Sequence, residues 1–316
     1  MCSRPLVSII VAVYNQLNVV KQALESIINQ TYENIEIIVS DDCSTDGTQE
    51  VLSRIASTNP KIRLFLQEKN LGITNNYNFL AAKVNGKYVA VFAGDDVMCP
   101  EKIEKQIVLL ENNPDSSFCH HAVTILGYTS NKIQGVITHK YVNGITTIHD
   151  VLRNLGIPGA MSIVCRRTAL KVPVFSPDIP TASDWLFIIH LTMTGKGLYI
   201  EEPLCFYRKD SDYNGKDPTQ YENDFLQTID VTRATYASLG DEIDKSCDYA
   251  LARYSLGAGY RRLIRGEQEK ARTLFKLAMP ERKLMVKAFV LYILSIISVS
   301  SRLLIISKQV YKKISQ

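Results

Sequence analysis

Between residues 5 and 112 the chain alternates between two hydrophobic periods. Residues 5–15 (PLVSIIVAVYN) are a nearly continuous apolar run typical of a buried strand, and residues 18–32 carry apolar side chains at helix spacing. The same order repeats three times, with strands expected at 34–42, 61–69 and 88–94 and helices at 45–57, 76–84 and 100–114. Such alternation with short connections predicts a Rossmann-like α/β fold, a mostly parallel sheet flanked by helices.

Two helix starts in this region have recognisable signals. We expect Thr45 or Asp46 to cap the second helix, because short polar side chains accept hydrogen bonds from the free N–H groups of a first turn. We expect Pro100 to lie in the first turn of the fourth helix, where its missing N–H costs nothing.

The rest of the chain predicts a less regular half followed by helices. Short strand-like pieces occur at 121–130 and 159–166, and residues 181–208 predict a loop, a helix starting at Asp184 and a strand. From about residue 220 the pattern is helical, with a helix pair meeting near Arg265 and Gly266. We therefore expect a domain over 1–215, with halves 1–112 and 113–215, and a helical C-terminal appendage over 216–316.

The C-terminal segment predicts a basic amphipathic helix over 283–313. Its longest uncharged stretch, 288–301, has 14 residues, whereas about 20 are needed to span a bilayer. One side of the helix is rich in Lys and Arg and the other in large apolar residues. Either peripheral contact with an anionic membrane surface or packing on the protein's own core fits this pattern.

Composition and charge exclude several classes of protein. A net charge of +4 in 316 residues gives no reason to expect nucleic acid as a partner. The seven cysteines are scattered singly with no CxxC pair, which indicates reduced thiols rather than disulfides or a zinc site. The first residues lack the pattern of a secretory signal, so we expect a cytoplasmic protein, peripheral on the inner face of the membrane if its tail binds lipid.

Polar residues follow the predicted strands at the points where the strands end. Tyr14 and Asn15 follow the first strand, residues 70–78 follow the third, and Asp95 and Asp96 follow the fourth. The second strand ends in two more acids, at positions 41 and 42. Ligands bind beyond the carboxyl ends of parallel strands, so these groups predict one binding edge, although loops are polar in any case.

Two long stretches of the sequence resemble a known family. Residues 7–48 (VSIIVAVYNQLNVVKQALESIINQTYENIEIIVSDDCSTDGT) and 70–106 (NLGITNNYNFLAAKVNGKYVAVFAGDDVMCPEKIEKQ) resemble the nucleotide-binding half of family 2 glycosyltransferases. A weaker similarity continues through 182–185 (ASDW) and 206–208 (FYR). The resemblance implies an inverting enzyme of GT-A fold. A dinucleotide-dependent oxidoreductase is excluded, because no G-x-G-x-x-G follows the first strand.

The resemblance assigns roles to individual positions. Asp184 corresponds to the general base that takes the acceptor proton, although an acid at a helix start can instead be a cap. Asp95 corresponds to the last acid of the family's Asp-x-Asp motif, which holds Mn²⁺ or Mg²⁺ on the donor diphosphate, and the neighbouring Asp96 is a second candidate ligand. The donor-binding positions implied in the same way are Ala12, Tyr14, Asn15, Asp41, Asp42, Asn70, Gly72, Asn78, Gly94 and Arg208. Lys209 and Lys216 are further candidates for contacting the diphosphate.

The chain also departs from the family pattern. Ala93 replaces the first acid of the Asp-x-Asp motif. Asp96 is the candidate to take over part of the role of that missing acid. Tyr77 stands where an arginine is common, and Asp210 where a histidine is common. The Gln-x-x-Arg-Trp motif of processive members is absent from the sequence, which favours single additions.

The sequence thus predicts a metal-dependent glycosyltransferase. We expect it to move a sugar from a nucleoside diphosphate, in the first place UDP, to a hydroxyl of a glycan or lipid-linked acceptor in bacterial cell-surface polysaccharide synthesis. The alternative is a nucleotide-sugar-binding protein without catalysis, because of Ala93.

Overall fold

The computed structural model describes residues 4–128, 130–171, 173–209 and 219–296. The chain divides into two compact units between Thr228 and Ile229. The predicted domain boundary near residue 215 lies outside the described residues, as do Asp210, Lys216 and the last part of the predicted C-terminal helix.

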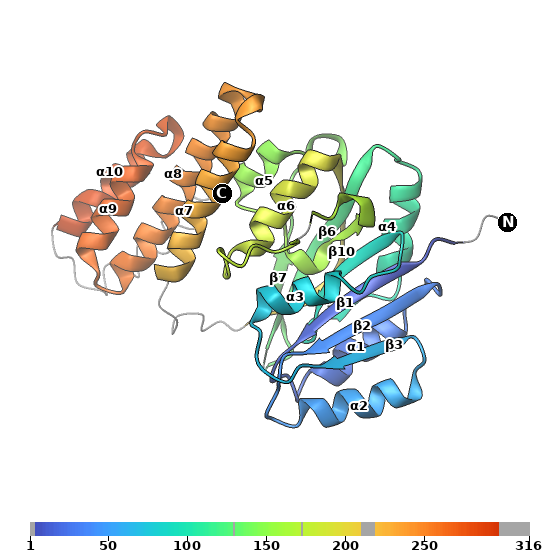
Figure 1. Ribbon diagram of the computed structural model, residues 1–316. Helices are drawn as coiled ribbons and strands as arrows, with labels where there is room; N and C mark the ends of the chain where they lie inside the picture. The colour runs from blue at the N-terminus through green and yellow to red at the C-terminus, as the bar shows by residue number, and fades with distance from the viewer. Residues whose placement is uncertain (1–3, 129, 172, 210–218, 297–316) are drawn as a thin grey trace. The chain divides into compact units, whose positions relative to one another are not determined.

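The first half of the sheet has the parallel arrangement that the sequence predicts (Figure 1). Four parallel strands lie in the order β3-β2-β1-β4. They are β1 (Val7–Val13), β2 (Ile35–Asp41), β3 (Ile62–Leu66) and β4 (Tyr88–Ala93). The helices that connect them are α1 (Val20–Ile28), α2 (Thr48–Thr58) and α3 (Ile73–Ala81). The apolar runs form strands here because helices cover the sheet and leave β1 buried along its whole length.

Two helix starts differ from the sequence prediction. Gly47 takes the N-cap position of α2 with φ of 95°, a backbone conformation that glycine adopts without a steric cost. Asp46 lies just before it and accepts the Thr48 N–H at 3.0 Å, so neither Thr45 nor Asp46 is the cap residue. Pro100 precedes α4 (Lys102–Glu111), and its carbonyl accepts the Thr31 N–H at 3.0 Å.

The second half of the sheet is mixed and more extensive than predicted. It contains β5 (Val97–Met98), β6 (Ser116–Gly127), β7 (Ile133–Ile137), β8 (Ile145–Thr146), β9 (Val164–Arg166) and β10 (Lys196–Lys209). The full order is β3-β2-β1-β4-β9-β6-β10-β5, with β7 paired to β6 and β8 to β10. β6 begins at residue 116 rather than 121. The sequence pattern misses its first residues because they include the polar side chains of Ser116, Ser117 and His120, which are nevertheless buried.

Helices and short turns complete the first unit. They are α5 (Ile148–Asn154), α6 (Ser183–Thr194) and the 3₁₀ turns η1 (Val142–Gly144), η2 (Ala160–Ser162) and η3 (Arg167–Ala169). The main hydrophobic core lies between the sheet and α1, α2 and α4, with Leu24, Leu52 and Ile103 among its buried members. The six described cysteines are all free thiols.

The second unit is helical, as predicted. α7 (Thr219–Thr235) crosses the boundary between the units, and η5 (Ala237–Leu239), α8 (Asp241–Ile264), α9 (Gln268–Ala278) and α10 (Arg282–Ile296) follow. The predicted helix pair is α8 and α9, which join at Gly266 in a left-handed conformation with φ of 81°. Among the helices described, none combines the length and apolar character needed to cross a bilayer.

α10 presents two different apolar faces. Leu284, Ala288 and Leu291 are buried in a cluster with α8 and α9. Tyr292 and Leu294 are half-buried against the same cluster. Six other large apolar side chains of the helix are exposed: Met285, Val286, Phe289, Val290, Ile293 and Ile296. Packing on the protein's own core therefore accounts for one face of the helix, and among the described residues nothing buries the other face.

Candidate active site

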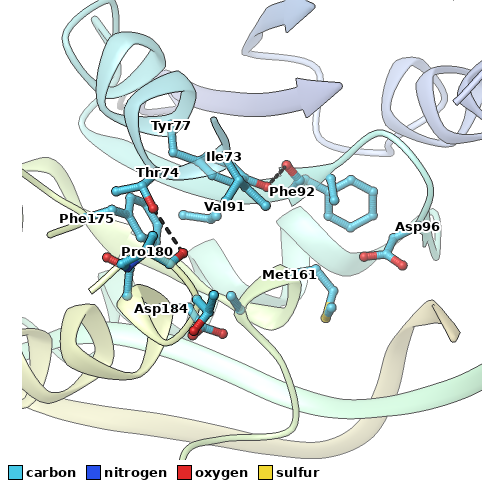
Figure 2. A pocket seen from close by; sticks show the side chains of 14 residues that line it. Ile73, Thr74, Tyr77, Val91, Phe92, Asp96, Met161, Phe175, Pro180 and Asp184 are labelled. Carbon is cyan, nitrogen blue, oxygen red and sulfur yellow. Dashed lines mark hydrogen bonds between the residues drawn. The ribbon is translucent and has the colours of Figure 1, made fainter. Parts of the chain in front are cut away.

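A cavity of about 370 Å³ opens beside the end of β4 (Figure 2). Its wall comes from α3, β4, the turn after β4, η2 and the segment 175–184 that leads into α6. Asp96 and Asp184, which the sequence predicts for the metal and for the base, both line it. The tertiary structure thus brings together two acids from separate parts of the chain.

The turn after β4 fixes where its two acids lie. The Gly94 N–H donates to the Ala12 carbonyl at 3.0 Å, which ties the turn to the end of β1. A Cβ atom on Gly94 would meet Gln16 Oε1 at 2.4 Å and Val13 Cγ2 at 2.7 Å, so a larger residue would push the turn outward. Glycine therefore leaves the space that the side chains of Val13 and Gln16 occupy here.

Asp95, which is half-buried, and Asp96, which is buried, form a pair of like charges. Asp96 is 1% exposed, and its Oδ1 accepts the Arg208 N–H at 2.9 Å. Burial raises the pKa of the Asp95 carboxyl, and burial together with the charge of Asp95 raises the pKa of Asp96 well above its ordinary value. The charge of Arg208 opposes both shifts. Removing two neighbouring carboxylates from water favours either protonation or a bound cation.

The donor set at this turn suits a hard divalent cation that the substrate helps to bind. In the described part of the chain, no three His, Cys, Asp or Glu side chains are grouped to hold a metal. Mg²⁺ in phosphate-transferring sites is commonly held by one or two carboxylates together with substrate phosphates, and Asp95 with Asp96 meets that requirement. The pair is compatible with a cation that arrives with its diphosphate.

Arg208 lies beside these acids in β10 and is 4% exposed. Its guanidinium donates to Gln22 Oε1 and to Asn131 Oδ1, and its Nε is buried with no hydrogen-bond partner within the described residues. Those contacts hold the positively charged guanidinium of Arg208 within electrostatic reach of Asp95 and Asp96. Contact between Arg208 and a diphosphate stays a prediction.

Asp184 is the second residue of α6 and lies in an apolar wall of the cavity. Ala182 takes the N-cap position and no side chain caps the helix. The alternative that Asp184 is the N-cap of α6 is therefore wrong. Its Oδ1 accepts the neighbouring Trp185 N–H at 2.8 Å. Asp184 is exposed at the cavity, but the apolar atoms around it displace water and raise the pKa of its carboxyl, and this hydrogen bond opposes the rise.

The segment that carries Asp184 is held by α7, which sequence reasoning did not identify. Asp224 Oδ2 accepts both the N–H and the Oγ1 proton of Thr181, each at 2.6 Å. The Trp185 and Phe225 rings stack with centroids 4.6 Å apart. Nothing local marks Asp224 as special, because it is one acid in a helical pattern. Its 1% exposure is evident only in three dimensions.

Asp41 and Asp42, at the end of β2, are buried and bonded to the protein. Asp41 accepts from Ser44 N at 2.9 Å, from Ser44 Oγ at 2.5 Å and from Gln49 Nε2 at 2.7 Å. Asp42 accepts the N–H groups of the loop after β3, at 2.7 Å from Leu71 and 3.0 Å from Gly72. Both acids shape this edge of the sheet, and their contact with the nucleotide base of a donor stays a prediction.

The loop after β3 and the start of α3 contain three more predicted donor-binding residues. Asn70 Oδ1 accepts the Gly72 N–H at 2.9 Å, and Gly72 has a φ of 79°. The Asn78 amide pairs with the Phe175 backbone through two hydrogen bonds of 2.7 and 2.9 Å. Asn78 thus fixes the cavity wall that contains Phe175, and a direct donor contact is untested.

The end of β1 lies beside the acids of β2 and β4. Ala12 pairs with Ala93, and Val13 pairs with Asp41. Beyond the strand, Tyr14 is 48% exposed, and Asn15 takes a left-handed conformation with φ of 50°. The predicted residues after three parallel strands therefore gather at one edge, as expected for a nucleotide site in such a sheet.

Comparisons with known proteins identify the family to which this chain belongs. A family model described as glycosyl transferase family 2 matches residues 8–171, more than half of the chain. This chain belongs to that family.

Two similar proteins extend the match in sequence. One is a glycosyltransferase of Haemophilus influenzae, itself uncharacterized, which is 30% identical over 243 residues, 73% of this chain and 74% of that protein. The other is TuaG of Bacillus subtilis, whose name assigns it to teichuronic acid biosynthesis; it is 29% identical over 65% of this chain and 79% of its own.

Solved structures of low sequence identity share the GT-A fold. TarS 1-349 of S. aureus matches with a TM-score of 0.63 and 16% identity over 96% of this chain and 91% of that one. The mannosyltransferase PcManGT of Pyrobaculum calidifontis, solved with GDP-Man and Mn²⁺, matches with a TM-score of 0.61 and 16% identity over 95% and 83%. The fold prediction from the sequence is confirmed.

Proposed function

We propose that this glycosyltransferase moves a sugar from a nucleoside diphosphate, UDP in the first place, to an acceptor hydroxyl with inversion at the anomeric carbon. The observation that carries the proposal is the single cavity lined by Asp96 and Asp184. Asp96 belongs to the turn that we expect to face the leaving diphosphate. Asp184 lies in the first turn of α6, which we expect to face the acceptor.

Asp184 is the proposed general base. A single displacement forms a bond from the acceptor oxygen to the anomeric carbon while the bond to the diphosphate oxygen breaks, and the acceptor proton must leave. A carboxylate whose pKa is raised by desolvation is a stronger base than one fully in water, and the apolar wall beside Asp184 provides that desolvation.

Asp95 and Asp96 are the proposed residues for Mn²⁺ or Mg²⁺. When bound, such an ion acts as a Lewis acid on the diphosphate leaving group. With Ala93 in place of a third acid, the donor phosphates and water would have to complete the coordination. The Mn²⁺ complex of PcManGT supports this proposal.

The proposed donor site is the edge formed by Ala12, Tyr14 and Asn15 with the acids of β2. Structures of TarS 1-349 in complex with UDP and with UDP-GlcNAc support UDP as the nucleotide. Arg208 and Lys209, at the end of β10, are the proposed cations for the diphosphate.

The proposed acceptor is a glycan or lipid-linked intermediate of bacterial cell-surface polysaccharide synthesis, a setting supported by the name of TuaG. The exposed apolar face of α10 lies on a segment that contains only basic charged residues from Arg282 onward. We place this face against the anionic inner surface of the cell membrane, which would bring a cytoplasmic enzyme and a lipid-linked acceptor together.

The test is the variant Asp184→Asn with Asp178→Asn as its control. Asp178 is an exposed acid in the same segment, so its loss changes the charge equally and leaves the cavity intact. We expect Asp184→Asn to keep UDP binding and to lose at least about a hundredfold in sugar turnover. We also expect chelation to abolish turnover and added Mn²⁺ to restore it.

Unchanged turnover in Asp184→Asn would rule out this residue as the base. UDP binding without turnover in the unaltered protein, tried with a panel of acceptors, would favour the non-catalytic alternative.

A further inference from the structure

The cavity between Asp96 and Asp184 has an unusual balance of polar groups. Most of its wall is apolar, with Ile73, Met161 and Phe175 on three different sides (Figure 2). Among the 14 described residues that line it, none has a cationic side chain. The charged side chains in this wall are the two carboxylates. A divalent cation held on Asp96 would be offset by the diphosphate that it binds, so the local field still disfavours a further anion.

Four hydroxyl groups also line the cavity, and each already donates its proton to the protein. The pairs are Thr74 Oγ1 to Pro180 O (3.2 Å), Tyr77 Oη to Phe92 O (2.8 Å), Thr181 Oγ1 to Asp224 Oδ2 (2.6 Å) and Ser183 Oγ to Ser176 O (3.0 Å). A hydroxyl that donates to a fixed partner keeps lone pairs that can accept. The lining side chains therefore offer hydrogen-bond acceptors to a ligand and no uncommitted donor.

We propose that this cavity takes an uncharged donor sugar and rejects a uronate, an inference that rests on the proposed glycosyltransferase function. Sugar hydroxyls are donors that the carboxylates of Asp96 and Asp184 can accept, and the C–H faces of a sugar ring can pack on Met161 and Phe175. A uronate carboxylate needs donors or a cation, and the side chains of this wall supply neither, while the proposed metal ion is engaged by the diphosphate. Burying the uronate here leaves an unpaired charge near the carboxylate of Asp184.

The most direct test of this proposal compares three donors that share one nucleotide and differ in the sugar. We would measure affinity and turnover for UDP-glucose, UDP-N-acetylglucosamine and UDP-glucuronate in the presence of Mn²⁺, with UDP itself as a competitor. At least one uncharged donor should exceed the uronate by about a hundredfold or more in kcat/KM and in affinity.

The outcomes separate the two proposals. If UDP binds and the uronate is used as well as the uncharged donors, the inference about the sugar is wrong and the glycosyltransferase proposal stands. If neither UDP nor any of its sugars binds, the proposed donor is wrong and the inference falls with it.

A charge placed at the rim of the cavity tests the mechanism of the selection. Ile73 is 63% exposed at the first position of α3 and lines the cavity, so Ile73→Arg adds a cation there without filling the core. We expect this variant to reduce the preference against the uronate at least about tenfold. Ile73→Gln, which adds no charge, and Val108→Arg, at a 56% exposed position outside the lining, should leave the preference unchanged. An unaltered preference in Ile73→Arg would contradict the electrostatic explanation.

Discussion

Lys102 is a fully buried lysine at the first position of α4. Within the described residues its Nζ atom has no hydrogen-bond partner. Burial lowers its pKa from 10.5 to about 8, and the nearby thiols of Cys205 and Cys119 oppose the shift. An ammonium group removed from water without a partner destabilises the folded state.

The variant Lys102→Met should therefore raise stability at pH 7. Below pH 8 the lysine is charged in both folded and unfolded states, so the full penalty is present, and it fades as the pH rises from 8 toward 10.5. Methionine of similar volume removes a cost of up to about 3 kcal/mol. Denaturant unfolding at pH 7 and pH 10 would measure the gain, which should shrink at the higher pH.

Lys105→Met on the same helix is the matched control. Lys105 is exposed and pairs with Glu202 at 2.6 Å, so its loss should not stabilise the protein. A Lys102→Met variant that is less stable than the parent at pH 7 would mean that the ammonium group has a partner or a role in the fold.

At the scale of elements, α7 positions the start of α6. Its residues Asp224 and Phe225 contact Thr181 and Trp185, which lie on either side of the proposed base. Both contacts belong to the first compact unit. The first turns of α7 thus act as part of the catalytic domain, even though the same helix continues into the second unit.

Asp224→Ala should lower kcat at least about tenfold and leave the KM for the donor nearly unchanged. Without the carboxylate, the Thr181 N–H loses its acceptor and the proposed base moves, and a displacement of about 1 Å can cost a hundredfold in rate. Asp224→Asn keeps an acceptor oxygen and should restore most of the rate. Steady-state kinetics of the three proteins would provide the comparison.

Asp230→Ala is a suitable control, because Asp230 is an exposed acid on the same helix. If Asp224→Ala and Asp224→Asn lowered the rate equally, or if KM rose while kcat stayed constant, Asp224 would not be positioning the base.

At the scale of the whole molecule, the exposed face of α10 is the part of the chain that we propose to contact the membrane. We expect the full chain to bind vesicles that contain phosphatidylglycerol more tightly than vesicles of phosphatidylcholine alone. The double variant Val286→Glu and Phe289→Glu should weaken this binding at least about tenfold, because it removes apolar surface and adds negative charge. Vesicle co-sedimentation would measure the difference.

Exposed apolar residues elsewhere provide the control for this experiment. Ile133 and Val136 on β7 are 67% and 53% exposed, so the variant Ile133→Glu and Val136→Glu makes the same chemical change in the first unit. Equal loss of binding in both double variants, or equal binding of the parent to both kinds of vesicle, would contradict a lipid-binding face on α10.

The sequence by itself determined the parallel half of the sheet and the positions of the proposed acids. β1 and β4 are buried on both faces, so each reads as an apolar run, and a residue that follows such a run in a parallel sheet must lie at the shared edge. Asp95 and Asp184 can be proposed from the sequence because family motifs are continuous short stretches of sequence.

Only the tertiary structure decided which polar groups are committed to the protein. Asp224 contacts Thr181 from 43 positions away, and Asp96 accepts the N–H of Arg208 from 112 positions away. It also decided that β6 extends back to Ser116 and that one apolar face of α10 is covered. Periodicity and capping signals report the neighbours of a residue along the chain, whereas burial and hydrogen bonding depend on residues that the fold brings together from far apart.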